Sequence, residues 1–163
     1  MVRTRRVKDR RRLRFETVDD CIAEIDRIVV ADSRGTLRKL GNWSPGQAFG
    51  HLASWIEYGW TGYPPMRKPP IVVRWLVPIV ARRFARRGLP VGVHIPGVKG
   101  GTYGMEELET SVGAERLKMA LVRLKAGEEA RYQSVVIGPL TMDERIQLNL
   151  RHAELHLSFL VPS

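Results

Sequence analysis

Two of the four histidines in this chain lie four residues apart, within RHAELHLSF at residues 151–159. In a helix, residues at this spacing share one side, and their Cβ atoms are about 5–6 Å apart. His152 and His156 can therefore direct both imidazoles at one divalent metal ion, for which neutral imidazole is a common ligand. Because such pairs also arise by chance, two hydrogen-bonded histidines inside an ordinary helical core are the alternative interpretation.

A helical wheel advances about 100° per residue and divides the predicted last helix, residues 142–160, into two arcs. His152 and His156 fall within the arc predicted to be buried, together with Arg145 and Asn149. Buried polar side chains without partners cost about 1–3 kcal/mol each, so a partner inside the fold is required. Arg145 is a candidate to pair with a substrate anion, and Asn149 to orient a ligand or water. The opposite arc is predicted to face solvent and contains Glu144, Gln147, Arg151, Glu154 and Ser158.

A third imidazole is predicted to point inward from a different helix. In GHLASWIEYGW, residues 50–60, the wheel places His51 beside Trp55 and Tyr58, which are candidates to line a pocket. Three histidines can occupy one side of a divalent ion and leave its other positions to water or substrate, as in catalytic metal sites. The zinc motif H-E-x-x-H is absent, and Glu154 on the predicted solvent face is a poor candidate for a ligand or base.

Helices must position these histidines, and hydrophobic periodicity predicts four or five of them with no convincing strand. Ser44 with Gln47, and Thr141 with Glu144, have the spacing of capping boxes, and Thr17 is a further N-cap candidate. One helical-bundle domain is expected over residues 15–163. The predicted helices cover 17–31, from 45 to between 59 and 62, 71–87, 105–125 and 142–160.

A glycine-rich connector at 88–104 contains six glycines in GLPVGVHIPGVKGGTYG. Its spacing fits neither a phosphate-binding loop nor a dinucleotide fingerprint, so a long connector at the rim of a pocket is expected. His94 lies in this stretch. It either closes over the site or, as we favour, is an ordinary loop histidine.

The net charge of +10 is concentrated at the N-terminus, where residues 1–14 hold eight of the 27 Arg and Lys residues and one of the 17 acidic residues. A second basic run, RRFARR, lies at 82–87, and the rest of the chain is close to neutral. The tail is expected to be a flexible, solubilising extension. Nonspecific nucleic-acid binding is the alternative, but no aromatic residue in the tail is available to stack on bases.

Two further observations bear on the compartment. The most apolar run, IVVRWLVPIVA at 71–81, contains Arg74 and Pro78 and is too short to span a bilayer, so a buried helix is expected. Cys21 is the single cysteine, which excludes an intrachain disulfide and a thiolate-cluster metal site. A reducing cytoplasm is the expected location.

Two motifs resemble the DinB/YfiT-like superfamily, and more narrowly one of its branches that is defined by a domain of unknown function. They are N-W-S-x-G-Q-x-x-G-H-L-A-x-W-I-E at 42–57 and G-P-L-T…R-H-A-E-x-H-L-x-F at 138–159. The resemblance covers about 15–160 and leaves out the basic tail. It implies an up-down-down-up four-helix bundle, a homodimer, and a divalent metal on His51, His152 and His156.

The same resemblance implies zinc, nickel, iron or manganese as the ion, without choosing among them. It also implies metal-dependent transferases or isomerases that use low-molecular-weight thiols. The expected function is therefore a metal-dependent enzyme acting on a small molecule, either a thiol-dependent S-transferase or a hydrolase. The alternative is a non-catalytic metal-binding or partner-binding bundle whose basic tail contacts nucleic acid.

Overall fold

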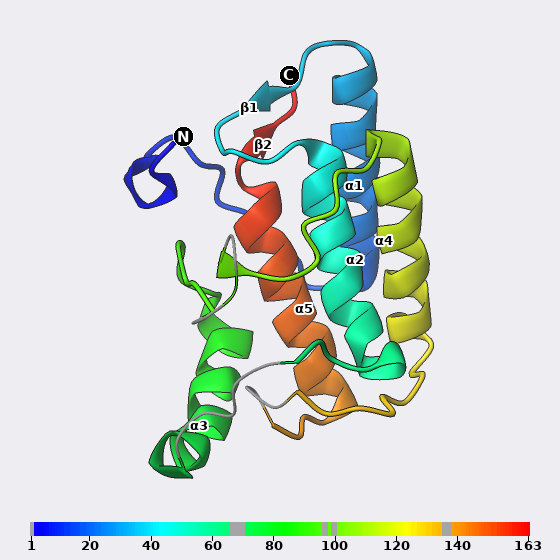
Figure 1. The fold of residues 1–163 in the computed structure, drawn as a ribbon. Helices are drawn as coiled ribbons and strands as arrows, with labels where there is room; N and C mark the ends of the chain where they lie inside the picture. Colours follow the sequence, from blue (N-terminus) through cyan, green and yellow to red (C-terminus); the bar gives the residue numbers. More distant parts are fainter. Residues whose placement is uncertain (1, 66–70, 96–97, 99–100, 135–137) are drawn as a thin grey trace.

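The computed structural model describes residues 2–65, 71–95, 98, 101–134 and 138–163, and the side chains of 71–78 lie outside this description. The described chain is mostly helical, and a short 3-10 turn, Thr4–Arg6, precedes the five α-helices. These are α1 (Val18–Ser33), α2 (Pro45–Thr61), α3 (Ile71–Arg87), α4 (Thr110–Lys125) and α5 (Met142–Leu157). Helices α1, α2, α4 and α5 lie side by side, whereas α3 packs mainly against α5 (Figure 1).

Local capping explains where three of the helices begin. The side chains of Thr17 and Thr141 accept hydrogen bonds from the backbone at the third helical residue, in complete capping boxes with Asp20 and Glu144. Ser44 caps α2 in the same way, but the Gln47 amide donates to the Met105 carbonyl and the box is half formed. Each such cap contributes about 1 kcal/mol.

One hydrophobic core joins α1, α2, α4 and α5. Each buried Leu, Ile or Phe side chain contributes about 1.5–3 kcal/mol relative to exposure. The core holds the two histidine-bearing helices, α2 and α5, against each other. Its fully buried members include Ile25, Ile28, Phe49, Leu117, Leu121, Leu124, Leu150 and Leu157.

The prediction of no strand was wrong. Two short strands, β1 (Arg38–Lys39) and β2 (Leu160–Val161), pair in antiparallel register. Because residues 160 and 161 pair with β1, the chain has to leave the helix before them. Helix α5 therefore ends at Leu157 and not at 160 as predicted. The pairing joins residues 121 and 123 positions apart in the sequence, which helical periodicity does not detect.

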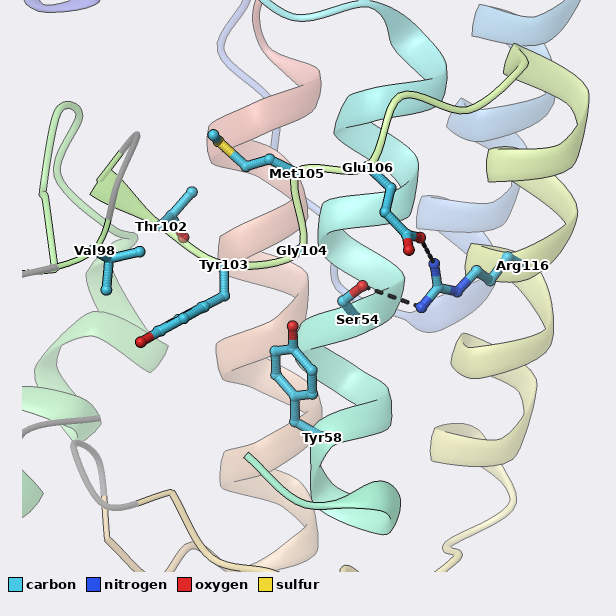
Figure 2. Close-up of a pocket in the computed structure, with 9 residues that line it drawn as sticks. All are labelled: Ser54, Tyr58, Val98, Thr102, Tyr103, Gly104, Met105, Glu106 and Arg116. Atoms are coloured by element: carbon cyan, nitrogen blue, oxygen red, sulfur yellow. Dashed lines mark hydrogen bonds and ion pairs between the residues drawn. The ribbon is translucent and has the colours of Figure 1, made fainter. Parts of the chain in front are cut away.

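The predicted start of the fourth helix at 105 was also wrong, since α4 begins at Thr110. The residues before it run across α2 at Gly46 and Gly50, where a Cβ atom would collide with Leu108. Glycine at these two positions lets the extended segment approach the helix closely. This approach brings the Tyr103–Glu106 segment over α2, as Figure 2 shows.

The predicted solvent face of α5 was wrong for three of its members. Arg151, Glu154 and Ser158 are 0%, 9% and 3% exposed, because the end of the basic tail and Phe15, the residue that follows it, run along this face. The Phe15 N–H donates to Glu154 Oε1 (2.6 Å), and Arg151 donates to the Phe15 carbonyl. Arg11 donates to the Leu157 carbonyl at 3.2 Å. This part of the tail therefore packs on the helices where a free extension was expected.

The expectation of a buried helix at 71–81 fails at its end, where Ile79 and Val80 are 64% and 42% exposed. Ala81 and Ala85 form the buried side of α3 instead. The side chains of 71–78 lie outside the described residues. Among the residues that are described, none of the helices has the length and apolar character needed to cross a membrane.

Candidate metal centre

His51 from α2 meets His152 and His156 from α5, as the helical wheels predicted. The His51 and His152 Nε2 atoms are 3.2 Å apart, and the His152 and His156 Nε2 atoms 3.1 Å. One ligand atom from each residue lies within 4.8 Å of the other two. The three rings are steeply inclined to one another, with interplanar angles of 77°, 66° and 73°.

A backbone carbonyl fixes the tautomer of His51. Its Nδ1 lies 2.8 Å from the Tyr103 carbonyl oxygen, which can only accept, so Nδ1 carries the proton and donates. In the neutral ring, Nε2 then presents a lone pair to the other two histidines. Hydrogen bonds of this kind orient metal-binding imidazoles and raise their basicity.

Hydrogen bonds alone do not account for the cluster. His152 Nε2 is the shared neighbour in both short contacts, yet a neutral imidazole nitrogen carries either one proton or one lone pair. If it donates to His51, it cannot accept from His156. A divalent ion about 2.0–2.1 Å from each nitrogen would place neighbouring nitrogens about 2.8–3.4 Å apart, which matches both contacts. The third pair of ligand atoms, at up to 4.8 Å, would have to close to about 4.2 Å or less to share the ion. These residues fit a metal ion, and the group is able to hold one.

Burial keeps the three imidazoles neutral. It lowers the pKa of His51 to about 4 from the ordinary value of 6.5, with the Tyr103 hydrogen bond acting in the opposite direction. Burial also lowers the pKa values of His152 and His156 well below 6.5, and the neighbouring histidines add to the effect. All three rings therefore keep lone pairs free for a metal at neutral pH.

These depressed pKa values predict that the metal-free protein loses stability in mild acid. Below about pH 6.5 the unfolded chain binds protons that the folded chain does not, so the free energy of unfolding falls as the pH decreases towards 4. The loss for His51 alone should reach about 3 kcal/mol. Urea unfolding in a chelator at pH 7.5, 6 and 5 measures it. A profile that is flat over this range would contradict the prediction.

Trp43 packs against two of the histidines, and the sequence analysis missed it. Its indole stacks on His156 with a centroid distance of 4.8 Å and an interplanar angle of 6°, and it meets the His51 ring edge-on at 4.9 Å. The available signal was its position directly before the Ser44 cap, since such a residue often packs on the first turns of its helix. Trp43 thereby restricts the orientations of both rings.

The histidines lie on the wall of a cavity of about 1350 Å³. Trp55, Arg145 and Asn149, three of the predicted pocket residues, also line it. The Trp55 indole N–H is buried and has no hydrogen-bond partner among the described residues. A buried donor of this kind costs about 1–3 kcal/mol unless a ligand or water accepts from it. The site therefore has room for a substrate beside an unsatisfied buried donor.

The fourth predicted pocket residue, Tyr58, lies elsewhere. Figure 2 shows it in a second pocket with Ser54, Glu106 and Arg116, on the side of α2 covered by the Tyr103–Glu106 segment. Burial raises the pKa of Tyr58. Its link to the metal centre is indirect: its ring meets the Trp55 ring edge-on, with a centroid distance of 5.7 Å.

The remaining candidates lie apart from the three-histidine group. His94 is exposed on the connector and lines the cavity. The Glu154 carboxylate accepts a hydrogen bond from the Phe15 N–H and forms an ion pair with Arg151 (3.1 Å), on the face of α5 covered by the N-terminal segment. Its exclusion as a ligand therefore stands, although the reason given from the wheel, exposure to solvent, was wrong.

A mostly helical fold with three convergent histidines on a cavity wall defines the class: a helical protein with a candidate metal centre. The chain belongs to the DUF1569 family, described as a protein of unknown function, whose model matches residues 7–163. The match begins inside the basic tail and includes the stretch that packs on α5. No curated protein and no solved structure matched the chain.

Proposed function

We propose that this protein is a divalent-metal-dependent enzyme acting on a small molecule, with His51, His152 and His156 as the metal ligands. The observation that carries the proposal is the convergence of three neutral imidazole nitrogens on the wall of a cavity. Three ligands from one side leave other coordination positions free, which is typical of catalytic and not of structural metal sites. The DinB/YfiT-like resemblance, with its four-helix bundle, supports the same interpretation.

A divalent ion held by three neutral ligands keeps its full charge and lowers the pKa of a water or thiol that binds to it. The described residues around such an ion can orient a substrate but offer few groups that transfer protons. Glu129 is the single carboxylate among the described cavity-lining residues, and it is exposed. Arg145 lines the cavity and can orient a substrate anion.

This shortage of carboxylates favours S-transfer over hydrolysis. A free thiol ionises with a pKa near 8.5, whereas bulk water requires about 15.7, so a thiol depends less on a protein base. We therefore place a low-molecular-weight thiol as cosubstrate ahead of water. Zinc, nickel, iron and manganese are all compatible with three imidazoles, and the donor set does not choose among them.

A homodimer is the proposed assembly. Val112, Met119 and Val122 are exposed on one side of α4 at helical spacing, away from the metal centre. Exposed apolar side chains on one helix face are available to pack against a second copy of the chain. Analytical ultracentrifugation of the purified protein tests this, and a monomeric mass at micromolar concentration would contradict it.

The direct test of the function is metal analysis of untreated, purified protein followed by an activity screen. We expect about one divalent ion per chain. Electrophilic small molecules offered with and without low-molecular-weight thiols should turn over in the metal-loaded protein and not after chelation. Bound metal without turnover would support the non-catalytic alternative, and absence of metal from protein purified without chelators would contradict the proposal altogether.

A further inference from the structure

The guanidinium of Arg145 is fixed in the cavity wall by neutral groups. It donates to the Ile56 carbonyl at 3.1 Å and to the Glu128 carbonyl at 3.3 Å, and its Cζ lies 4.8 Å from the centre of the Trp60 ring. It rests on α2 at Gly59, where a Cβ atom would collide with it. These contacts use two of its five N–H groups and hold the plane of the guanidinium in place.

No described carboxylate forms an ion pair with Arg145. The nearby Glu128 carboxylate instead accepts hydrogen bonds from two nitrogens of Arg123, at 2.8 and 2.6 Å. The Arg123 guanidinium also lies over the Trp60 ring. Burial lowers the pKa of Arg145, but a guanidinium still remains charged at neutral pH. Arg145 therefore lines the cavity with a positive charge that no described carboxylate contacts directly, although the Glu128 carboxylate is close enough to act on it, and with unused donors.

The rest of the described cavity lining is also positive on balance. Besides Arg145, its charged lining among the described residues consists of three exposed arginines from the N-terminal segment, Arg3, Arg5 and Arg6, and of Glu129. Arg5 also donates to the Gly92 carbonyl on the connector, which holds the segment at the cavity. Most other lining side chains near the histidines are apolar or aromatic, including Trp43, Phe84, Leu148, Leu155 and Phe159.

Helix geometry separates Arg145 from the metal centre. Arg145 and His152 are seven residues apart on α5, and Gly59, on which the guanidinium rests, is eight residues from His51 on α2. At 1.5 Å per residue, both helices place the two sites about 10–12 Å apart. One small anion cannot bridge this distance, so a molecule that uses both sites has to be about two aromatic rings long.

We propose that Arg145 is the anion-binding residue of this cavity, and that the ligand is an elongated apolar molecule with a carboxylate or phosphate at one end. The anion binds the guanidinium, the body packs along the apolar wall, and the other end reaches the three histidines. The arginines of the N-terminal segment attract the anion over a longer range. That the end of the ligand at the histidines reacts there rests on the metal-dependent function proposed above. The anion site at Arg145 does not depend on that function.

The probes are 4-biphenylcarboxylate, 4-biphenylyl phosphate and the neutral 4-biphenylmethanol, titrated by calorimetry into the full-length protein. We expect saturable binding of at least one anion and binding of the alcohol that is at least tenfold weaker. Arg145→Gln should weaken anion binding by roughly tenfold to a hundredfold, because charge-assisted hydrogen bonds are lost. The two anions distinguish a carboxylate site from a phosphate site.

Arg123→Gln combined with Glu128→Gln is the matched control, since it removes the other guanidinium from Trp60 without changing the cavity lining and without freeing the Glu128 carboxylate to pair with Arg145. It should bind the anions as the wild type does. Arg145→Lys keeps the charge without the planar fork and should show an intermediate affinity. Thermal unfolding of each variant verifies that it folds. Equal affinities for alcohol and anions, equal losses in the Arg123 and Arg145 variants, or no saturable binding of any probe would overturn the proposal.

Each titration is repeated after chelation, because a carboxylate can also ligate a metal ion. Binding that depends on Arg145 should survive chelation with its affinity changed less than threefold. If anion binding disappears with the metal and is insensitive to Arg145→Gln, the anion binds at the histidines and the proposal fails. If the protein carries no metal at all, Arg145-dependent binding still stands while the enzymatic function does not.

Discussion

Replacing His152 by Ala should reduce the metal content of the purified protein from about one ion per chain to a small fraction of that. The reason is geometric: His152 Nε2 makes both short contacts, to His51 at 3.2 Å and to His156 at 3.1 Å, so its loss leaves two nitrogens without their common neighbour. His51→Ala should have the same effect from the other helix. Mass-spectrometric metal analysis after dialysis measures both.

His94→Ala is the matched control for this experiment. His94 lines the same cavity but lies outside the three-histidine group, so its removal should leave the metal content unchanged. Circular dichroism should show unchanged helical content in all three variants. Trp43 offers a second readout, because it stacks on His156 and its fluorescence should be quenched by nickel in the wild type. Full metal retention by both His51→Ala and His152→Ala would contradict the site.

Replacing Glu154 by Ala should destabilise the fold by about 3–5 kcal/mol, although this residue is not in the metal centre. Arg151 is 0% exposed and loses its carboxylate partner in this variant, and the Phe15 N–H loses its acceptor. An uncompensated buried charge is among the largest single-residue penalties in a folded protein. Urea unfolding monitored by circular dichroism at pH 7 measures the change.

Glu115→Ala is the matched control for Glu154→Ala. Glu115 and Lys118 form an ion pair on α4 with the same i, i+3 spacing, but Glu115 is exposed to solvent. Its removal should cost about 0–1 kcal/mol. Replacing Arg151 by Met together with Glu154→Ala should recover much of the lost stability, since no buried charge then remains. Similar small losses in the Glu154 and Glu115 variants would show that the buried pair contributes little.

Helix positions and the grouping of the histidines could be predicted from the sequence, because both depend on local rules. Thr17, Ser44 and Thr141 cap helices through hydrogen bonds to residues three positions away. The i, i+4 spacing of His152 and His156 places both on one side of any helix that contains them. The amphipathic pattern of α2 then indicates that His51 points into the same interior.

The sequence alone could not show which segment would cover each helix face. The wheel assigned Arg151 and Glu154 to solvent because polar residues on a helix usually face water, yet Phe15, more than 130 positions away at the end of the tail, covers them. Similarly, the Tyr103 carbonyl that orients His51 belongs to a connector 52 positions away, and backbone carbonyls carry no sequence signal. Local hydrogen bonds and periodicity are encoded within a few residues, whereas burial and the orientation of the ligands depend on contacts between distant segments that exist only in the folded chain.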